Sequence, residues 1–246
     1  MSWLKSHPFA IEAHFESSLV LSYCYPAEFL QQLIPPCFEL DCWQKKWGFV
    51  ALAMVSTEKL RPKGFPEWMG RNFILAGFRI FVRYQNRQGK KLRGLYIMES
   101  ATDSRIMNFA GNLMTHYRYQ HGDFKKLAGG NSLEFESKKL AFKIKANWEV
   151  ENIDLPKSSP FADWSEARRF AGPLPFTFSY LEKEQKVLVV EGVRTNWSPQ
   201  PVFVVQESVQ MPSVLQEAPA KLANAFLVQN VPYYWKKGRL EKWANS

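Results

Sequence analysis

The sequence has few of the features that mark secreted, metal-bound or membrane-spanning proteins. Its 246 residues include three cysteines, Cys24, Cys37 and Cys42, an odd number without the spacing of a zinc site. No run approaches the roughly 18 consecutive apolar residues that a membrane-spanning helix needs. The start, MSWLKSHPFAIEAHFESS, has no apolar signal core. We therefore expect reduced, structural cysteines, a cytoplasmic location, no membrane partner, no metal and no cofactor.

Acidic residues are in the minority, with 23 Asp and Glu against 32 Lys and Arg, which gives a net charge of +9. A basic surface attracts phosphate whatever the fold. The lysines and arginines, however, are scattered in pairs, with no basic helix and no aromatic RNA-binding motif. The distribution favours a solvated surface over a nucleic-acid site. Nonspecific binding of anionic surfaces or nucleic acid is kept as the weakest of three functional alternatives.

Aromatic residues are abundant, and apolar residues mostly alternate with polar ones. Apolar residues make up 46% of the chain and aromatic residues 15%. In the segment 77–84, Phe78, Ile80 and Val82 share one face, while Arg79 and Arg83 lie on the other, because successive strand side chains point in opposite directions. The pattern predicts strands over 19–25, 38–43, 47–56, 77–84, 92–100, 117–124, 132–137, 142–146, 176–180, 186–196, 202–212 and 225–234.

Helical patterns are few. The spacing predicts three short helices, over 26–33, 103–114 and 163–170, the second capped by Thr102 or Asp103. There is no internal repeat, and PKSSP at 156–160 is the one linker-like stretch. Strands that outnumber helices this strongly indicate a mainly β (α+β) fold, a barrel or strongly curved sheet closed at its ends by helices. We expect a single domain over 1–246.

Six ordered segments resemble a known superfamily over roughly residues 10 to 235. LVLSYCYPAEFLQQLIPPCFELD resembles the N-terminal part of acetoacetate decarboxylase. WGFVALAMVSTEKLRPKGFP, FRIFVRY and GKKLRGLYIMESATDS are similar to the YqjF-like family of uncharacterised bacterial proteins in that superfamily, and SPFADWSEARRF and TNWSPQPV agree in order. The resemblance implies an acetoacetate decarboxylase-like fold: a closed, cone-shaped antiparallel β-barrel whose cavity holds a small molecule.

The residues of the decarboxylase chemistry are missing. That reaction needs a lysine amine that attacks a ketone and forms a Schiff base. The matching segment, 111–119, contains no lysine, and Lys125 and Lys126 further on are expected in an exposed turn. The strand 49–54 is wholly apolar where the decarboxylase has a glutamate. Schiff-base decarboxylation is therefore not expected, and whether the protein is an enzyme stays open.

The candidate ligand-binding residues are cations and aromatics near strands. Arg79, with Arg83 on the same face, would need a carboxylate or an anionic ligand if it points into a barrel. Arg61 lies in the turn RPKGFP, Tyr117 begins a predicted strand, and Trp197 could form a cavity wall. For each, a structural role is the alternative. The leading hypothesis is a barrel that binds a small organic acid or related metabolite. Whether the protein forms a homo-oligomer stays open.

An enzymatic alternative uses two further residues. Glu99 ends one predicted strand and His116 begins another, so the two could meet at one mouth of a barrel. An acid and base pair of this kind must lie within about 3 Å or be joined by one water. Together with Arg79 as the group that orients an acid, they would fit a lyase or hydrolase.

Overall fold

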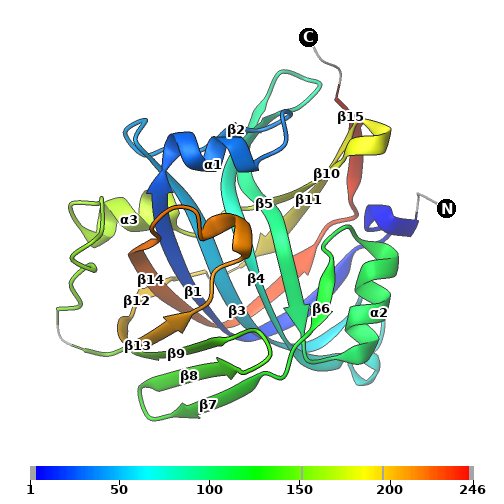
Figure 1. The fold of residues 1–246 in the computed structure, drawn as a ribbon. Coiled ribbons are helices and arrows are strands. Elements are labelled where there is room, and N and C mark those ends of the chain that lie inside the picture. The colour runs from blue at the N-terminus through cyan, green and yellow to red at the C-terminus, as the bar shows by residue number, and fades with distance from the viewer. Residues whose placement is uncertain (1–3, 151, 196, 244–246) are drawn as a thin grey trace.

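A computed structural model describes residues 4–150, 152–195 and 197–243, and these residues form two β-sheets with short helices around them (Figure 1). The larger sheet is built around long, bent strands. Its strands are β1 (Ile11–Pro26), β2 (Glu39–Leu40), β3 (Trp47–Pro62), β4 (Arg71–Gln85), β5 (Lys91–Thr102), β6 (Tyr119–His121), β10 (Phe176–Leu181), β11 (Lys186–Arg194), β12 (Gln200–Pro201), β14 (Lys221–Trp235) and β15 (Arg239–Lys242).

The pairings in the larger sheet return to their starting strand. The order β14-β1-β3-β4-β5-β10-β11 runs through neighbouring pairs, and β11 pairs again with β14 through Gly192, Val193 and Arg194. Most pairs are antiparallel, as predicted, but β10 and β6 each run parallel to β5. A prediction of purely antiparallel pairing is therefore wrong at β5, because the chain reaches both partners through long connections that contain helices.

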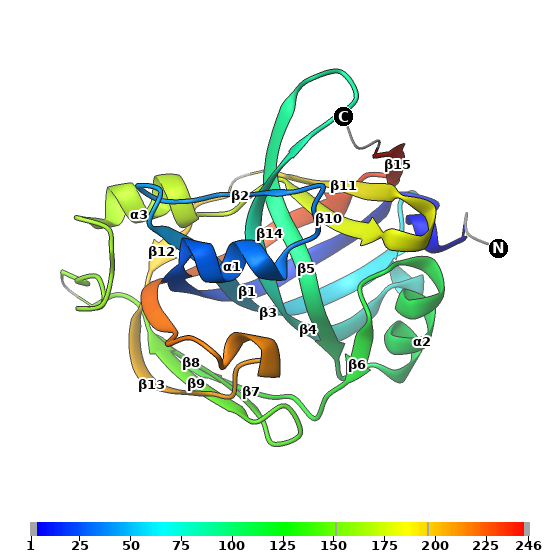
Figure 2. The same ribbon diagram turned by 45° about the horizontal axis from the view of Figure 1, so that its top comes forward.

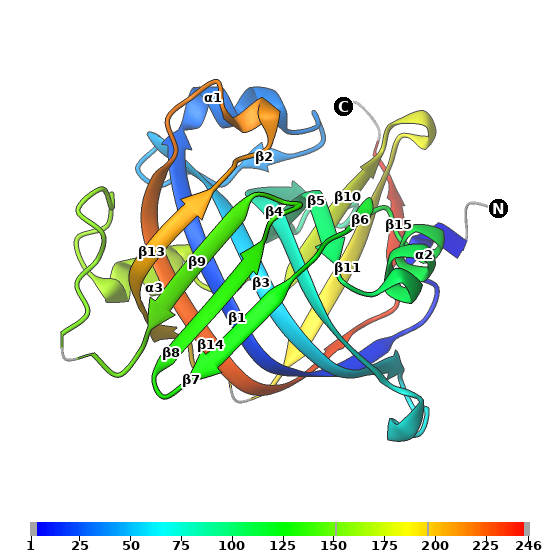
Figure 3. The ribbon, with the colours of Figure 1, turned by 60° about the horizontal axis from the view of Figure 1, so that its bottom comes forward.

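The smaller sheet lies across one face of the larger one (Figure 3). Its order is β13-β9-β8-β7, formed by β7 (Lys125–Gly129), β8 (Ser132–Ser137), β9 (Phe142–Asn147) and β13 (Phe203–Val209). Leu133, Phe135 and Ile144 point from it into the main apolar core, where they meet side chains such as Leu52 and Ile80 of the larger sheet. Burial of these apolar faces is the main force that holds the two sheets together.

The three predicted helices are confirmed within one or two residues. They are α1 (Ala27–Leu33), α2 (Arg105–Met114) and α3 (Trp164–Ala171), with single 3-10 turns at Leu4–Ser6, Glu67–Met69, Glu182–Glu184 and Ser213–Leu215. Ser104, rather than Thr102 or Asp103, caps α2 by accepting a bond from the amide of Met107. Helices α2 and α3 lie on opposite sides of the molecule (Figure 2). No helix among the described residues is long and apolar enough to cross a membrane.

The predicted strands coincide with strands of the structure, but their lengths differ in both directions. The segment 77–84 lies inside the longer β4, and 132–137 matches β8, whereas 38–43 contributes only Glu39 and Leu40. Three strands, β7, β12 and β15, were missed. Asn196, the predicted end of β11, lies outside the described residues.

The two faces of β4 have different neighbours. Ile80 and Val82, with Phe78, belong to the core that includes α1 and the smaller sheet. The opposite face carries Arg79 and Phe81, and Phe81 packs with α3 and Phe49 of β3. The larger sheet is therefore covered on one face by α1 and the smaller sheet, and its other face carries Arg79 and packs in part against α3.

Candidate functional site

Arg79 lies among tyrosines inside the ring of paired strands. Burial lowers the pKa of its guanidinium, opposed by the nearby Tyr119, Tyr117 and Tyr233. Arg79 is on β4 and Tyr233 on β14, and these strands are separated by at least two others in either direction around the ring. Side chains so placed can approach each other only across the inside. Arg79 is therefore turned toward the inside of the ring of paired strands.

The guanidinium of Arg79 has no carboxylate partner among the described residues. Its one hydrogen bond is donated from Nη1 to the carbonyl oxygen of Gly77, at 3.1 Å. The tyrosines near it stay neutral: burial raises the pKa of Tyr117 to about 12 and also raises the pKa values of Tyr119 and Tyr233. The guanidinium of Arg79 is therefore a cation surrounded by neutral tyrosine hydroxyl groups.

The turn after α2 brings Tyr117 and Tyr119 to this position. Arg118 between them has a left-handed backbone, φ 53°, and the two rings lie 6.1 Å apart. The hydroxyl of Tyr117 is 3.1 Å from that of Thr177 on β10. Asn112 of α2 accepts a bond from the amide of Tyr119 and donates one to its carbonyl, which fixes the start of β6 against the helix.

Tyr233 is held by a glycine and a second arginine. A Cβ atom at Gly192 would lie 1.7 Å from the Tyr233 hydroxyl, so this ring needs a glycine beside it. Arg194 lowers the pKa of Tyr233 against the effect of burial. Arg194 donates to the carbonyl oxygens of Pro173 and Leu174 and stacks over the ring of Trp197, 4.5 Å from its centre. Trp197 is thus a support for Arg194.

A row of side chains in register with Arg79 extends around the inner face. Arg79 is opposite Ala51, Ala51 is opposite Ser22, and Ser22 is opposite Asn224. Directly opposed residues of antiparallel strands share a face. The Ser22 hydroxyl and both polar atoms of the Asn224 amide are buried, with no hydrogen-bond partner among the described residues. Such groups in folded proteins are normally paired with protein or water.

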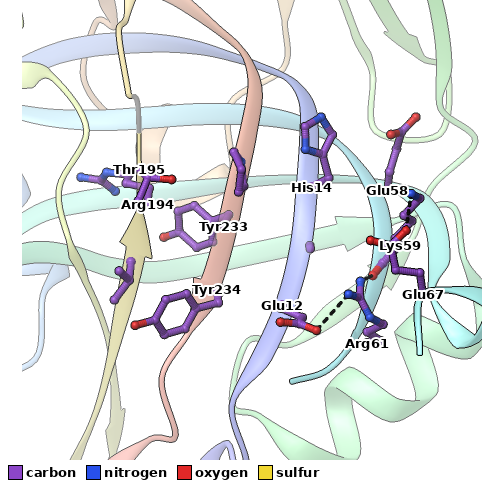
Figure 4. A pocket seen from close by; sticks show the side chains of 13 residues that line it. Glu12, His14, Glu58, Lys59, Arg61, Glu67, Arg194, Thr195, Tyr233 and Tyr234 are labelled. Atoms are coloured by element: carbon purple, nitrogen blue, oxygen red, sulfur yellow. Dashed lines mark hydrogen bonds and ion pairs between the residues drawn. The ribbon is translucent and has the colours of Figure 1, made fainter. Parts of the chain in front are cut away.

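Two of the predicted ligand-binding arginines have carboxylate partners. Arg83 binds the buried Asp41, with 2.7 Å between Nη2 and Oδ1, and Arg93 binds the other oxygen of Asp41. Arg61 pairs with Glu12 at 2.9 Å and lines a surface pocket of about 500 Å³ (Figure 4). Both arginines are thus paired with carboxylates of the protein itself.

The predicted acid and base residues are not brought together. Glu99 is exposed and lines a pocket of about 290 Å³ between the two sheets. His116 lines a different pocket, near Tyr180 and Glu184, and burial lowers its pKa. No hydrogen bond joins them among the described residues, so the structure offers no shared site for proton transfer between Glu99 and His116.

Lys126 is not in an exposed turn, contrary to the prediction. It lies in β7 with 14% of its side chain exposed, and its Nζ is 2.7 Å from Oε2 of Glu16. Ser56 donates a hydrogen bond to the same oxygen. This lysine ties the smaller sheet to β1 and does not face Arg79. The segment where the resemblance would place a catalytic lysine carries Tyr117 and Tyr119 instead.

Solved structures similar to this chain share one type of fold. An acetoacetate decarboxylase-like enzyme from Sphingomonas wittichii aligns with a TM-score of 0.58 at 11% identity, covering 97% of this chain and 94% of that one. Acetoacetate decarboxylase from Legionella pneumophila aligns at 0.59 and 10%, covering 93% and 86%. The enduracididine biosynthesis enzyme MppR, complexed with pyruvate, aligns at 0.52 and 10%, covering 93% and 90%. The fold is therefore acetoacetate decarboxylase-like.

A family model identifies the chain more closely. The model for DUF2071, described as an uncharacterised conserved protein, matches residues 12–232, and the protein belongs to this family. The predicted relationship to the YqjF-like family is confirmed. No curated protein matches the sequence.

Some of the residues that meet around Arg79 were candidates from the sequence. Arg79 and Tyr117 were predicted, whereas Tyr119, Tyr233 and Arg194 were not. Tyr233 lies more than 100 residues from Arg79 in the chain, and no local pattern shows that the two meet. A signal existed for Arg194, since it lies in the predicted strand 186–196, three residues before the candidate Trp197.

Proposed function

We propose that this protein binds a small organic acid inside the ring of strands, with the carboxylate held by Arg79. The observation that carries the proposal is a buried guanidinium with no carboxylate partner among the described residues. Taking a charge out of water is expensive unless it is paired. A carboxylate is the natural partner, because its two oxygens match the fork of donors on a guanidinium.

The surroundings of Arg79 favour a ligand over a sealed core. Arg79, Tyr119 and Tyr233 are enclosed by protein, as the pKa shifts from burial indicate, and yet each keeps part of its surface accessible. Both properties are expected of side chains that border an internal space. Directly opposite Arg79 on β3 is a small residue, Ala51. We infer that the ring of strands is a closed barrel with this space inside.

The ligand we propose is small. Neutral tyrosine hydroxyls and the unpaired groups of Ser22 and Asn224 suit a polar acid with a hydroxyl or carbonyl group. MppR, which shares the fold, is complexed with pyruvate, and we propose a ligand of that size and class. Because the segment 111–119 contains no lysine, the proposed function is binding without Schiff-base chemistry. We also propose a single domain that works in the cytoplasm with its cysteines free.

Ligand-induced stabilisation tests the proposal. Thermal unfolding is followed with formate, acetate, pyruvate, lactate and acetoacetate, in a buffer free of other carboxylates. An acid at about 100 times its dissociation constant adds about 2.7 kcal/mol to the unfolding free energy, which raises the melting temperature by several degrees. Arg79→Met should abolish the shift.

Arg83→Met is the matched control. It makes the same substitution on the same face of the same strand, four residues away, at a residue bound to Asp41. This variant should keep the shift. Equal shifts in wild type and Arg79→Met, or no shift with any of the acids, would overturn the proposed function.

A further inference from the structure

Helix α2 exposes an apolar face. Ile106, Phe109 and Leu113 follow one another at helical spacing and are all exposed, Phe109 at 72%. The opposite side of the helix packs inward, where Gly111 contacts the ring of Tyr119. These three residues, the α2 face, have no packing partner within the described residues, and exposed apolar side chains grouped in this way mark an interaction surface.

The connection between β3 and β4 exposes a second apolar group. Phe65, Trp68 and Met69 all lie in this loop, and Trp68 is 82% exposed, the highest value among the large apolar residues described. We call these three residues the 65–69 tip. The tip projects from the body of the molecule, below α2 in Figure 3.

The α2 face and the 65–69 tip lie at the same end of the molecule. The amide of Ile74, near the start of β4, donates to Oδ1 of Asp103, just before α2, at 2.9 Å. The β3–β4 connection and the beginning of α2 therefore extend from neighbouring points of the sheet. One flat or soft partner could contact both.

The charges around these residues are mainly positive. A surface pocket of about 500 Å³ beside Phe109 and Leu113 is lined by Lys5, Arg105 and His121, with no acidic residue in its lining. Next to the tip, Lys63 and Arg71 are exposed, while the acidic Glu67 is paired with Lys59 at 2.5 Å. The partner of this end should carry negative charge.

We propose that the α2 face and the 65–69 tip bind the surface of an anionic lipid bilayer. Tryptophan and phenylalanine flanked by lysine and arginine are typical of segments that insert into the interfacial region of a membrane. Anionic lipids attract the flanking cations, and a fluid bilayer can admit a projecting tip. A second copy of this chain would bring the same uncompensated cations to the interface, which favours the lipid surface.

Vesicle sedimentation with the full chain tests this inference. The vesicles are pure phosphatidylcholine or phosphatidylcholine with phosphatidylserine as roughly one third of the lipid. The protein should sediment with the anionic vesicles and not with the neutral ones. Binding should weaken between about 0.1 M and about 1 M salt, where the screening length falls from about 10 Å to about 3 Å. Trp68→Ser combined with Phe109→Ser should lower the partition coefficient at least about tenfold, because two inserted aromatic side chains are lost.

The matched control removes equally exposed apolar residues elsewhere. Leu127→Ser combined with Phe203→Ser changes two edge strands of the smaller sheet, at side chains 67% and 53% exposed, and should bind vesicles like wild type. Sedimentation with neither vesicle, equal sedimentation with both, or equal loss in the two double variants would overturn the inference. So would a wild-type dimer that Trp68→Ser with Phe109→Ser converts to a monomer, because a second copy would then cover this end.

Discussion

Replacing Arg79 by methionine should make the ligand-free protein more stable. The substitution removes a charge that burial already penalises and leaves a side chain of similar length. The loss is the single hydrogen bond to Gly77 O, about 1.5–3 kcal/mol for a charged donor. The gain is the cost of burying one ion, several kcal/mol even after the protein relaxes. The balance is a stabilisation of about 1–3 kcal/mol.

Denaturant unfolding in a buffer free of carboxylates measures this balance. Arg83→Met is again the matched substitution, since it leaves the buried Asp41 with Arg93 as its remaining ion partner. Because Arg83 is partly exposed, its loss should cost about 1–2 kcal/mol. If Arg79→Met instead destabilises the protein by as much as Arg83→Met, Arg79 has a structural partner and the argument from an unpaired charge is refuted.

Three further predictions concern single residues. Burial lowers the pKa of His7 from 6.5 to about 4. As the pH falls, the unfolded chain therefore binds a proton at this residue before the folded protein does. The free energy of unfolding should fall by about 2 kcal/mol between pH 7 and pH 5. His7→Asn, which tolerates the left-handed backbone there, should flatten this dependence in unfolding measured at each pH. Gly192→Ala should push the Tyr233 ring aside and lower the free energy of unfolding by about 1–3 kcal/mol. The same variant should bind the acid more weakly in titration calorimetry. Glu99→Gln and His116→Gln should leave the affinity for the acid unchanged, and a tenfold loss in either would restore the enzymatic alternative.

The sequence predicted the fold best where one face of a strand is buried. Segment 77–84 alternates clearly because β4 separates an apolar core from the interior around Arg79. Strands β7, KKLAG, and β15, RLEK, were missed because they are short and none of their residues is buried. Such strands show no alternation of apolar and polar residues. The parallel pairs of β5 depend on contacts far apart in the chain, which local patterns do not encode.

The site was predictable only one strand at a time. Mid-strand position identified Arg79 as a buried cation, and the same argument wrongly promoted Arg83, whose partner Asp41 lies on a different segment. Asp41 itself, an acid inside the apolar stretch FELDCW, was a signal that a cation would be needed there. The approach of Tyr233 to Arg79 arises from ring closure and could not be deduced from either segment.

A crystal structure with the acid that stabilises the protein most tests the central claim directly. We expect density for the acid inside the ring of strands, with its carboxylate oxygens within hydrogen-bond distance of the Arg79 guanidinium and close to Tyr117 or Tyr233. Density for the acid in the pocket beside Glu99 or the one beside His116, with the guanidinium of Arg79 still bonded only to Gly77 O, would contradict it.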